Sequence, residues 1–137
     1  MHHWLPPAER SIGVPAKDIL IVDDEAGICE LLAGALEDAG YAVDVAATAA
    51  EARSLLQECQ YGMVVVDWRL PDGDGAVIAS LAEAAGSHAF VMSGYLPRML
   101  AGNIDPRQTL MKPVKPSELL ATARECIGEP IGAEDHP

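Results

Sequence analysis

Aromatic and basic residues are scarce in this sequence of 137 residues. Phe, Trp and Tyr make up 4% of the chain, while hydrophobic residues of all kinds make up 50%, so we expect an aliphatic, alanine-rich core. Only 9 Lys and Arg stand against 21 Asp and Glu, which gives a formal net charge of -12. Such an acidic chain repels phosphate backbones and anionic membrane surfaces, so direct nucleic-acid binding is not expected.

Cysteine is also scarce, and long apolar runs are missing. Cys29, Cys59 and Cys126 are an odd number at wide spacings, which is typical of free thiols in a reducing compartment and not of disulfides or a metal site. No apolar run approaches the roughly 18 residues of a membrane span. The first residues lack the apolar stretch of a secretion signal. We therefore expect a cytoplasmic protein with no membrane insertion.

Short apolar runs alternate with helical patterns along most of the chain, which predicts one domain over residues 17–128. We interpret residues 1–16 as an N-terminal extension and residues 129–137 as a C-terminal tail. The expected strands cover 19–22, 41–45, 63–66, 89–92 and 109–111, and the expected helices cover 28–36, 48–59, 75–85 and 116–127. Because Pro and Gly interrupt residues 96–106, a further helix there should be short or irregular. This alternation predicts an α/β fold with a parallel sheet covered on both faces.

Polar side chains follow four of the five expected strands at the point where each strand ends. Asp23 and Asp24 follow the first strand, and Asp67 ends the third. Ser93 ends the fourth strand, and Lys112 comes after the fifth. Ligands of open parallel sheets bind beyond these carboxyl ends. We therefore expect the five side chains to form one site.

Three converging carboxylates need positive charge nearby. One pair about 5 Å apart, at an effective dielectric near 20, costs roughly 3 kcal/mol. Lys112 supplies one charge, and Mg²⁺ fits the remainder because it favours carboxylates, water and phosphate oxygens. Lys112 and the hydroxyl of Ser93 can then face an oxyanion. This combination indicates phosphoryl chemistry, with Asp67 as the candidate nucleophile.

The same residues lie in four motifs that resemble the receiver domain of two-component response regulators. The motifs are Ile-Leu-Ile-Val-Asp-Asp-Glu over 19–25, Val-Val-Val-Asp-Trp-Arg-Leu-Pro-Asp-Gly-Asp-Gly over 64–75, Met-Ser-Gly-Tyr over 92–95, and Lys-Pro over 112–113. Four ordered motifs are far more specific than any one. The resemblance implies a flavodoxin-like fold with strand order 2-1-3-4-5. It also implies that Asp67 accepts a phosphoryl group from a histidine kinase or a histidine phosphotransfer protein.

The resemblance assigns roles within the site. Asp24, Asp67 and the backbone carbonyl of Arg69 are expected to hold Mg²⁺, with Asp23 acting largely through water. Ser93 and Lys112 are expected to contact the phosphoryl oxygens.

One switch position departs from the family pattern. Receivers often carry Tyr or Phe three residues before the lysine, and Thr109 stands there in this chain. Tyr95, two residues after Ser93, is a hypothetical substitute. Ser93, Thr109 and Tyr95 are therefore the candidate switch residues.

The expected output is protein binding, with no enzymatic activity beyond the phosphorylation and dephosphorylation of the chain itself. A stand-alone receiver, a phosphorelay intermediate and a fragment of a larger kinase all fit, and the downstream protein and a homodimer stay open. A phosphorylation-independent adaptor is the main alternative. An Asp-nucleophile phosphatase is less favoured because Arg69 occupies the position of its second Asp. The nucleotide-binding motifs GxxxxGK[ST] and GxGxxG do not occur.

Overall fold

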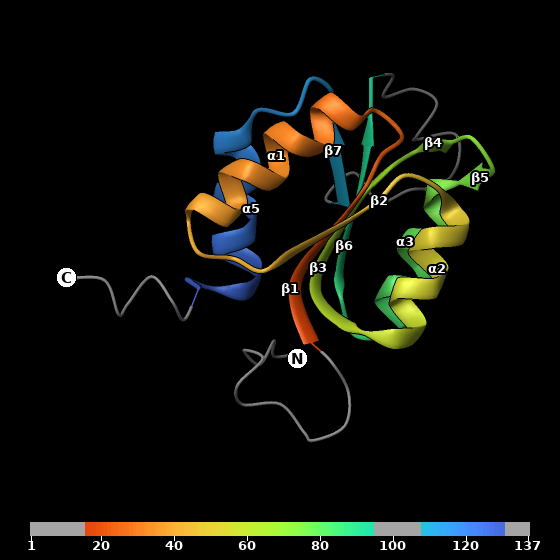
Figure 1. Cartoon of the computed structure of the whole chain (residues 1–137), viewed down its shortest axis with the longest axis horizontal. Helices are drawn as coiled ribbons and strands as arrows, with labels where there is room; N and C mark the ends of the chain where they lie inside the picture. Colours follow the sequence, from red (N-terminus) through yellow and green to blue (C-terminus); the bar gives the residue numbers. More distant parts are fainter. Residues whose placement is uncertain (1–15, 95–107, 131–137) are drawn as a thin grey trace.

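The structure of the chain is a computed structural model that describes residues 16–94 and 108–130 (Figure 1). Its main sheet contains β1 (Ala16–Val22), β2 (Val43–Ala46), β3 (Gln60–Asp67), β6 (His88–Ser93) and β7 (Thr109–Met111). The helices are α1 (Ala26–Asp38), α2 (Ala49–Glu58), α3 (Gly75–Ala84) and α5 (Pro116–Ile127). Tyr95 and the segment 96–106, with its expected short or irregular helix, lie outside the described residues.

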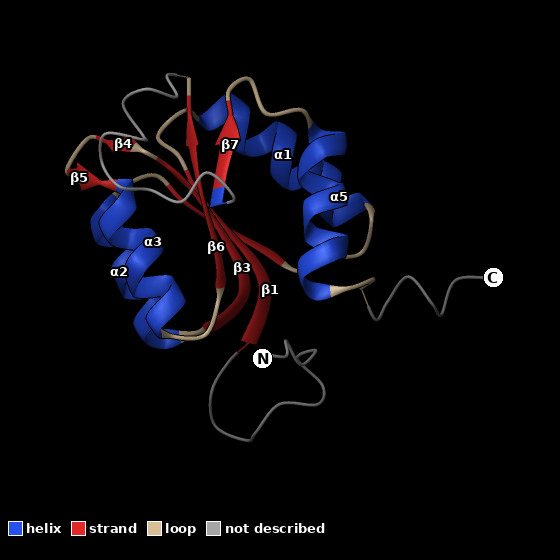
Figure 2. Ribbon diagram, turned by 180° about the vertical axis from the view of Figure 1, so that it is seen from behind, coloured by secondary structure: helices blue, strands red, loops and turns tan. Residues whose placement is uncertain are grey.

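The sheet is parallel, and its strand order is β2-β1-β3-β6-β7. With the two short hairpin strands β4 (Arg69–Leu70) and β5 (Gly73–Asp74) set aside, this is the predicted order 2-1-3-4-5 of a flavodoxin-like fold. The prediction is therefore confirmed. Helices α1 and α5 cover one face of the sheet, and α2 and α3 cover the other (Figure 2).

The two central strands explain why the sheet needs helices on both faces. Every side chain of the runs 19–22 and 63–66 is fully buried. Alternate residues face opposite sides, so Leu20 and Val64 join the core under α2 and α3, while Ile19 and Met63 join the core under α1 and α5. Continuous aliphatic runs of this kind are typical of strands buried on both faces.

Local signals set most of the helix ends where the sequence predicts them. Thr48 accepts a hydrogen bond from the amide of Glu51 at 3.1 Å and so caps α2. Pro116 is the first residue of α5. Gly40 follows α1 with φ of 108°, a conformation that favours glycine.

Several strand boundaries differ from the prediction: β1 and β3 each begin three residues earlier than expected, and β2 begins later. Residues 41–45 were expected to form the second strand, but it begins at Val43. The amide of Tyr41 donates to the carbonyl of Leu36 at 3.1 Å, and this bond belongs to the end of α1. The hydroxyl of Tyr41 donates to the carbonyl of Gly128 at 2.7 Å, which links this turn to the end of α5.

A small hairpin follows β3. Strands β4 (Arg69–Leu70) and β5 (Gly73–Asp74) pair antiparallel. Asp74 then caps α3 by accepting from the amide of Ala76 at 2.8 Å. The hairpin therefore joins the end of β3 to the start of α3 by ordered backbone.

Glycine is required at the first residue of α3. A Cβ atom on Gly75 would lie 2.0 Å from the carbonyl oxygen of Asp67, a separation that no side chain permits. The amide of Gly75 also donates to the carbonyl of Trp68 at 2.7 Å. Helix α3 thus begins in direct contact with the carboxyl end of β3.

Within the described ranges, no helix has the length and apolar character needed to cross a lipid bilayer.

Candidate functional site

The candidate residues meet at the carboxyl edge of the sheet. Asp23 follows β1, Asp67 is the last residue of β3, and Lys112 follows β7. The amide of Lys112 donates to the carbonyl of Ser93, the last residue of β6, at 2.9 Å. The strand ends are therefore joined by backbone bonds just below the side chains of interest.

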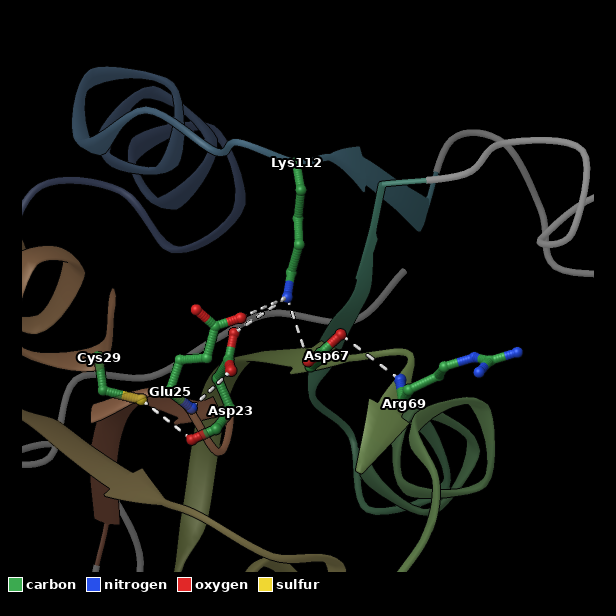
Figure 3. Close-up of polar contacts among 6 residues, drawn as sticks. All are labelled: Asp23, Glu25, Cys29, Asp67, Arg69 and Lys112. Carbon is green, nitrogen blue, oxygen red and sulfur yellow. Dashed lines mark hydrogen bonds and ion pairs between the residues drawn. The ribbon is translucent and has the colours of Figure 1, made fainter. Parts of the chain in front are cut away.

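Lys112 lies among three carboxylates (Figure 3). Its Nζ is 3.1 Å from Oδ2 of Asp67 and 3.4 Å from Oδ2 of Asp23. It is also 4.0 Å from Oε1 of Glu25, a side chain that is 60% exposed. The sequence analysis did not include Glu25, although its position directly after the acidic pair was a usable signal. One ammonium group thus serves three acids.

Asp23 is the most deeply buried of these acids, with 1% of the residue exposed. Its Oδ1 accepts a hydrogen bond from the amide of Glu25 at 3.0 Å. Its Oδ2 is buried and, within the described part of the chain, lacks a hydrogen-bond partner; Lys112 reaches it only as an ion pair. A buried carboxylate oxygen without a donor is costly unless another charge compensates it. Asp23 is therefore built to face an additional positive group.

The acidic pair does not cap the following helix. The residue before α1 is Glu25, and its side chain makes no capping bond. The backbone carbonyl of Asp23 instead accepts a bond from the thiol of Cys29 at 3.2 Å. Burial, reinforced by the charge of Asp23, raises the pKa of Cys29 to about 11, so that the thiol stays protonated at neutral pH. The acidic pair is therefore not needed to cap α1.

Asp67 is nearly buried, with 8% of the residue exposed. Its Oδ1 accepts a long hydrogen bond of 3.4 Å from the amide of Arg69. Burial raises the pKa of Asp67, the contact with Lys112 acts in the opposite direction, and the charge of Asp23 adds to the increase. The balance is upward because two acids share one amine in a weakly solvated position.

Lys112 stays charged in this environment. Burial alone lowers the pKa of Lys112, but the bond to Asp67 and the charges of Asp23 and Asp67 outweigh it, so the net change is upward. The amine is therefore a permanent cation at neutral pH.

The donor set fits a hard divalent cation. Carboxylate oxygens of Asp23, Asp24 and Asp67 all lie within 4.8 Å of one another. Asp24 is exposed and the other two are buried. Mg²⁺ prefers oxygen donors with access to water on one side. Its charge would also stabilise Oδ2 of Asp23, which has no hydrogen-bond donor among the described residues.

The remaining predicted residues fall into two groups. Arg69 contributes its amide to the site while its guanidinium extends away from Asp67 (Figure 3). Ser93 is buried at the end of β6. Thr109 is half-buried at the start of β7, and Tyr95 lies outside the described residues. The structure therefore unites the acids and the lysine and leaves the switch residues as a prediction.

Comparisons with known proteins agree with this geometry. The family model for the response regulator receiver domain matches residues 19–124. The acid tolerance regulatory protein ActR of Rhizobium meliloti is 30% identical over 135 residues, which are 95% of this chain and 70% of that protein. Response regulator Rre1 of Synechocystis is 34% identical over 125 residues, which are 85% of this chain and 54% of Rre1.

Solved structures show the same likeness. The receiver domain protein of Methanospirillum hungatei has a TM-score of 0.68 at 30% identity, covering 82% of this chain and 93% of that one. The beryllofluoride-activated receiver domain dimer of NtrC4 has a TM-score of 0.69 at 30% identity, covering 80% of this chain and 95% of that one. With four ordered motifs, the predicted strand order and the acidic site in place, the chain belongs to the response regulator receiver domain family of two-component signalling.

Proposed function

We propose that the chain accepts a phosphoryl group on Asp67 from a histidine kinase or a histidine phosphotransfer protein and passes the signal on by binding another protein. The observation that carries the proposal is the excess of negative charge at the site. Three carboxylates share Lys112, and Oδ2 of Asp23 is buried without a hydrogen-bond donor from the described residues. A cation stabilises a site of this kind, and the cation and Lys112 can then pair with the oxygens of an incoming phosphoryl group.

The transfer is a substitution at phosphorus. A carboxylate oxygen of Asp67 forms the new bond to phosphorus, and the bond from phosphorus to the donor's imidazole nitrogen breaks. The electron pair stays on that nitrogen, and the donor ends as a neutral imidazole because its other ring nitrogen carries a proton during the transfer. The ammonium of Lys112, 3.1 Å from Oδ2 of Asp67, is placed to pair with the phosphoryl oxygens once the carboxylate has become an acyl phosphate. The hydroxyl of Ser93 is a second donor at the same edge.

Mg²⁺ would be held by Asp23, Asp24 and Asp67, with the carbonyl of Arg69 as the ligand that family resemblance adds. When bound, it supplies positive charge to phosphoryl oxygens. Its fit rests on the convergence of the three carboxylates within 4.8 Å.

Turnover of free phosphoesters is not part of the proposal. A phosphatase of the haloacid-dehalogenase type uses a second Asp two residues after its nucleophile as general acid. Arg69 occupies that position, and its guanidinium extends away from Asp67 (Figure 3). The proposed chemistry is limited to phosphorylation of Asp67 and hydrolysis of the product.

Intact mass spectrometry after incubation with Mg²⁺ and acetyl phosphate tests the proposal. The wild-type chain is expected to gain one phosphoryl group, and Asp67→Asn is expected to gain none. Omission of Mg²⁺ serves as the second control. If neither acetyl phosphate nor a phosphorylated histidine phosphotransfer protein modifies the wild-type chain, the phosphorylation-independent adaptor replaces this proposal.

A further inference from the structure

Asp72 joins the hairpin after β3 to a different helix. It lies between β4 and β5, and its two carboxylate oxygens accept hydrogen bonds from the first amides of α2. Oδ1 accepts from Ala49 at 2.7 Å, and Oδ2 accepts from Ala50 at 3.0 Å. These bonds span 23 and 22 residues of sequence, so they fix tertiary structure. Both are charge-assisted, because a carboxylate accepts them at the positive end of a helix.

The hairpin also packs against α2 at the same point. A Cβ atom on Gly73 would lie 3.3 Å from the Cβ of Ala49, so the two backbones approach closely. Figure 1 shows the hairpin beside the ends of α2 and α3 that lie nearest the carboxyl edge of the sheet. The tip of the hairpin is thus held by two hydrogen bonds and a close backbone contact.

Helix α2 already has a cap of its own. Thr48 precedes the helix and accepts from the amide of Glu51 at 3.1 Å. Thr48 therefore satisfies the third amide of α2 locally, whereas Asp72 satisfies the first two from another part of the chain. Of these two caps, only Asp72 connects the helix to the segment that follows Asp67.

The other end of the hairpin reaches the phosphoacceptor. Arg69 pairs with Asp74 in the hairpin, and its amide donates to Oδ1 of Asp67 at 3.4 Å. A bond of this length responds strongly to small shifts of the donor. The first strand of the hairpin therefore supplies the amide that contacts Oδ1 of Asp67.

We propose that Asp72 is a positioning residue: by tying the hairpin to the first turn of α2, it sets the place of the Arg69 backbone and through it the orientation of the Asp67 carboxylate. This inference rests on the proposed function for its catalytic consequence, but its structural part stands on the metal-free protein alone.

The experiment compares Asp72→Ala with the matched variant Thr48→Ala. Both remove a side-chain cap from the start of α2, and only Asp72→Ala releases the hairpin. The first readout is the amide signal of Arg69 in ¹H–¹⁵N NMR spectra of the metal-free proteins. The second is the dissociation constant for Mg²⁺, from the same signals during a titration. The third is the initial rate of phosphorylation by acetyl phosphate.

Asp72→Ala is expected to shift the Arg69 amide, to weaken Mg²⁺ binding and to slow phosphorylation, the last two by about threefold or more, below the tenfold or larger effects of groups that touch a ligand-holding side chain directly. Thr48→Ala is expected to lower the melting temperature while leaving all three readouts near their wild-type values. Asp72→Asn keeps one acceptor oxygen and serves if Asp72→Ala does not fold.

Equal effects of the Asp72 and Thr48 variants on all three readouts would overturn the inference, because Asp72 would then be only a helix cap. An unchanged Arg69 amide in Asp72→Ala would overturn it as well. A wild-type chain that takes no phosphoryl group contradicts the proposed function, and the Arg69 signal and Mg²⁺ affinity still decide the role of Asp72.

Discussion

Two charged clusters on the same sheet, one around Asp44 and one around Lys112, differ in how many donors and cations each has for its carboxylates. On β2, Asp44 accepts a hydrogen bond from the hydroxyl of Tyr61 at 2.6 Å and pairs with Lys17 at 3.6 Å. At the carboxyl edge, among the residues that the structure describes, Lys112 is the one cation paired with three carboxylates. The first cluster has two donors for one acid, and the second has one cation for three acids.

The difference separates a carboxylate that stabilises the fold from carboxylates that would take part in the proposed phosphoryl transfer. Burial, followed by the bond to Asp44, raises the pKa of Tyr61 far above its ordinary value, so the phenol is a permanent donor. With Lys17 nearby, the charge of Asp44 is satisfied within the protein. The acids around Lys112 carry more negative charge than the one ammonium offsets, and a further cation would compensate the excess.

The largest effect should come from removing the amine of Lys112, with removal of the amine of Lys17 as the comparison. Lys112→Ala leaves the buried carboxylates of Asp23 and Asp67 without their cation, and we expect it to lower the unfolding free energy of the metal-free protein by about 2–4 kcal/mol. Lys17→Ala removes a partly exposed ion pair and should cost about 0.5 kcal/mol or less. Urea unfolding with and without Mg²⁺ measures both, and Mg²⁺ should restore part of the loss in Lys112→Ala only. Similar losses in the two variants would refute the comparison.

The same substitution should have opposite effects in the two clusters. Asp67→Asn removes one of the competing charges and is expected to raise the unfolding free energy by about 1 kcal/mol, the scale of two screened charges a few ångström apart. Asp44→Asn weakens the bond to Tyr61 and removes the pair with Lys17, so it should lower that energy by about 1 kcal/mol. Thermal unfolding of the metal-free proteins at neutral pH checks the signs; a loss of stability in Asp67→Asn would argue against the crowded site.

The smallest effect concerns pH, and it distinguishes Asp72 from Asp67. Hydrogen bonds from Ala49 and Ala50 lower the pKa of Asp72 below its ordinary value of 3.8. Asp72 therefore stabilises the fold above pH 3.8, and this contribution is lost as the pH falls through the lowered pKa. Burial raises the pKa of Asp67 above 3.8, so ionised Asp67 destabilises the fold progressively as the pH rises through the raised value.

Melting curves of metal-free wild type, Asp72→Asn and Asp67→Asn between about pH 2 and pH 7 test this contrast. At neutral pH, Asp72→Asn should melt below wild type and Asp67→Asn above it. Both differences should shrink toward zero in acid. Differences that do not change with pH would mean that ionisation of these carboxylates is not their cause.

Sequence reasoning predicted the helices and strands because their signals are local, and the resemblance to the receiver domain supplied the strand order. Apolar runs, the capping pattern of Thr48 and the break at Gly40 each act within a few residues. It also placed Asp23, Asp67 and Lys112 together, because parallel strands bring their carboxyl ends to one edge of a sheet.

The contacts that sequence reasoning missed depend on register between distant segments. The bond between Tyr61 and Asp44 requires knowing how β1 aligns β2 with β3. The bonds from Asp72 to the first turn of α2 require knowing where the hairpin tip lies in space. Glu25 reaches Lys112 only because the backbone turns sharply after Asp23. The contacts of Tyr61 and Asp72 follow neither from periodicity nor from a motif, whereas Glu25 at least lies next to the acidic pair in the sequence.

The contact between Gly75 and the backbone of Asp67 has a mechanical consequence. No atom fits between the first residue of α3 and the carbonyl of Asp67, where even a methyl carbon would lie 2.0 Å from the oxygen. The amide of Gly75 is bonded to the next carbonyl along, that of Trp68, at 2.7 Å. If Asp67 is phosphorylated as proposed, a displacement of the end of β3 is therefore expected to carry the start of α3 with it. Helix α3 would then transmit a local change at Asp67 to the surface that the helix presents.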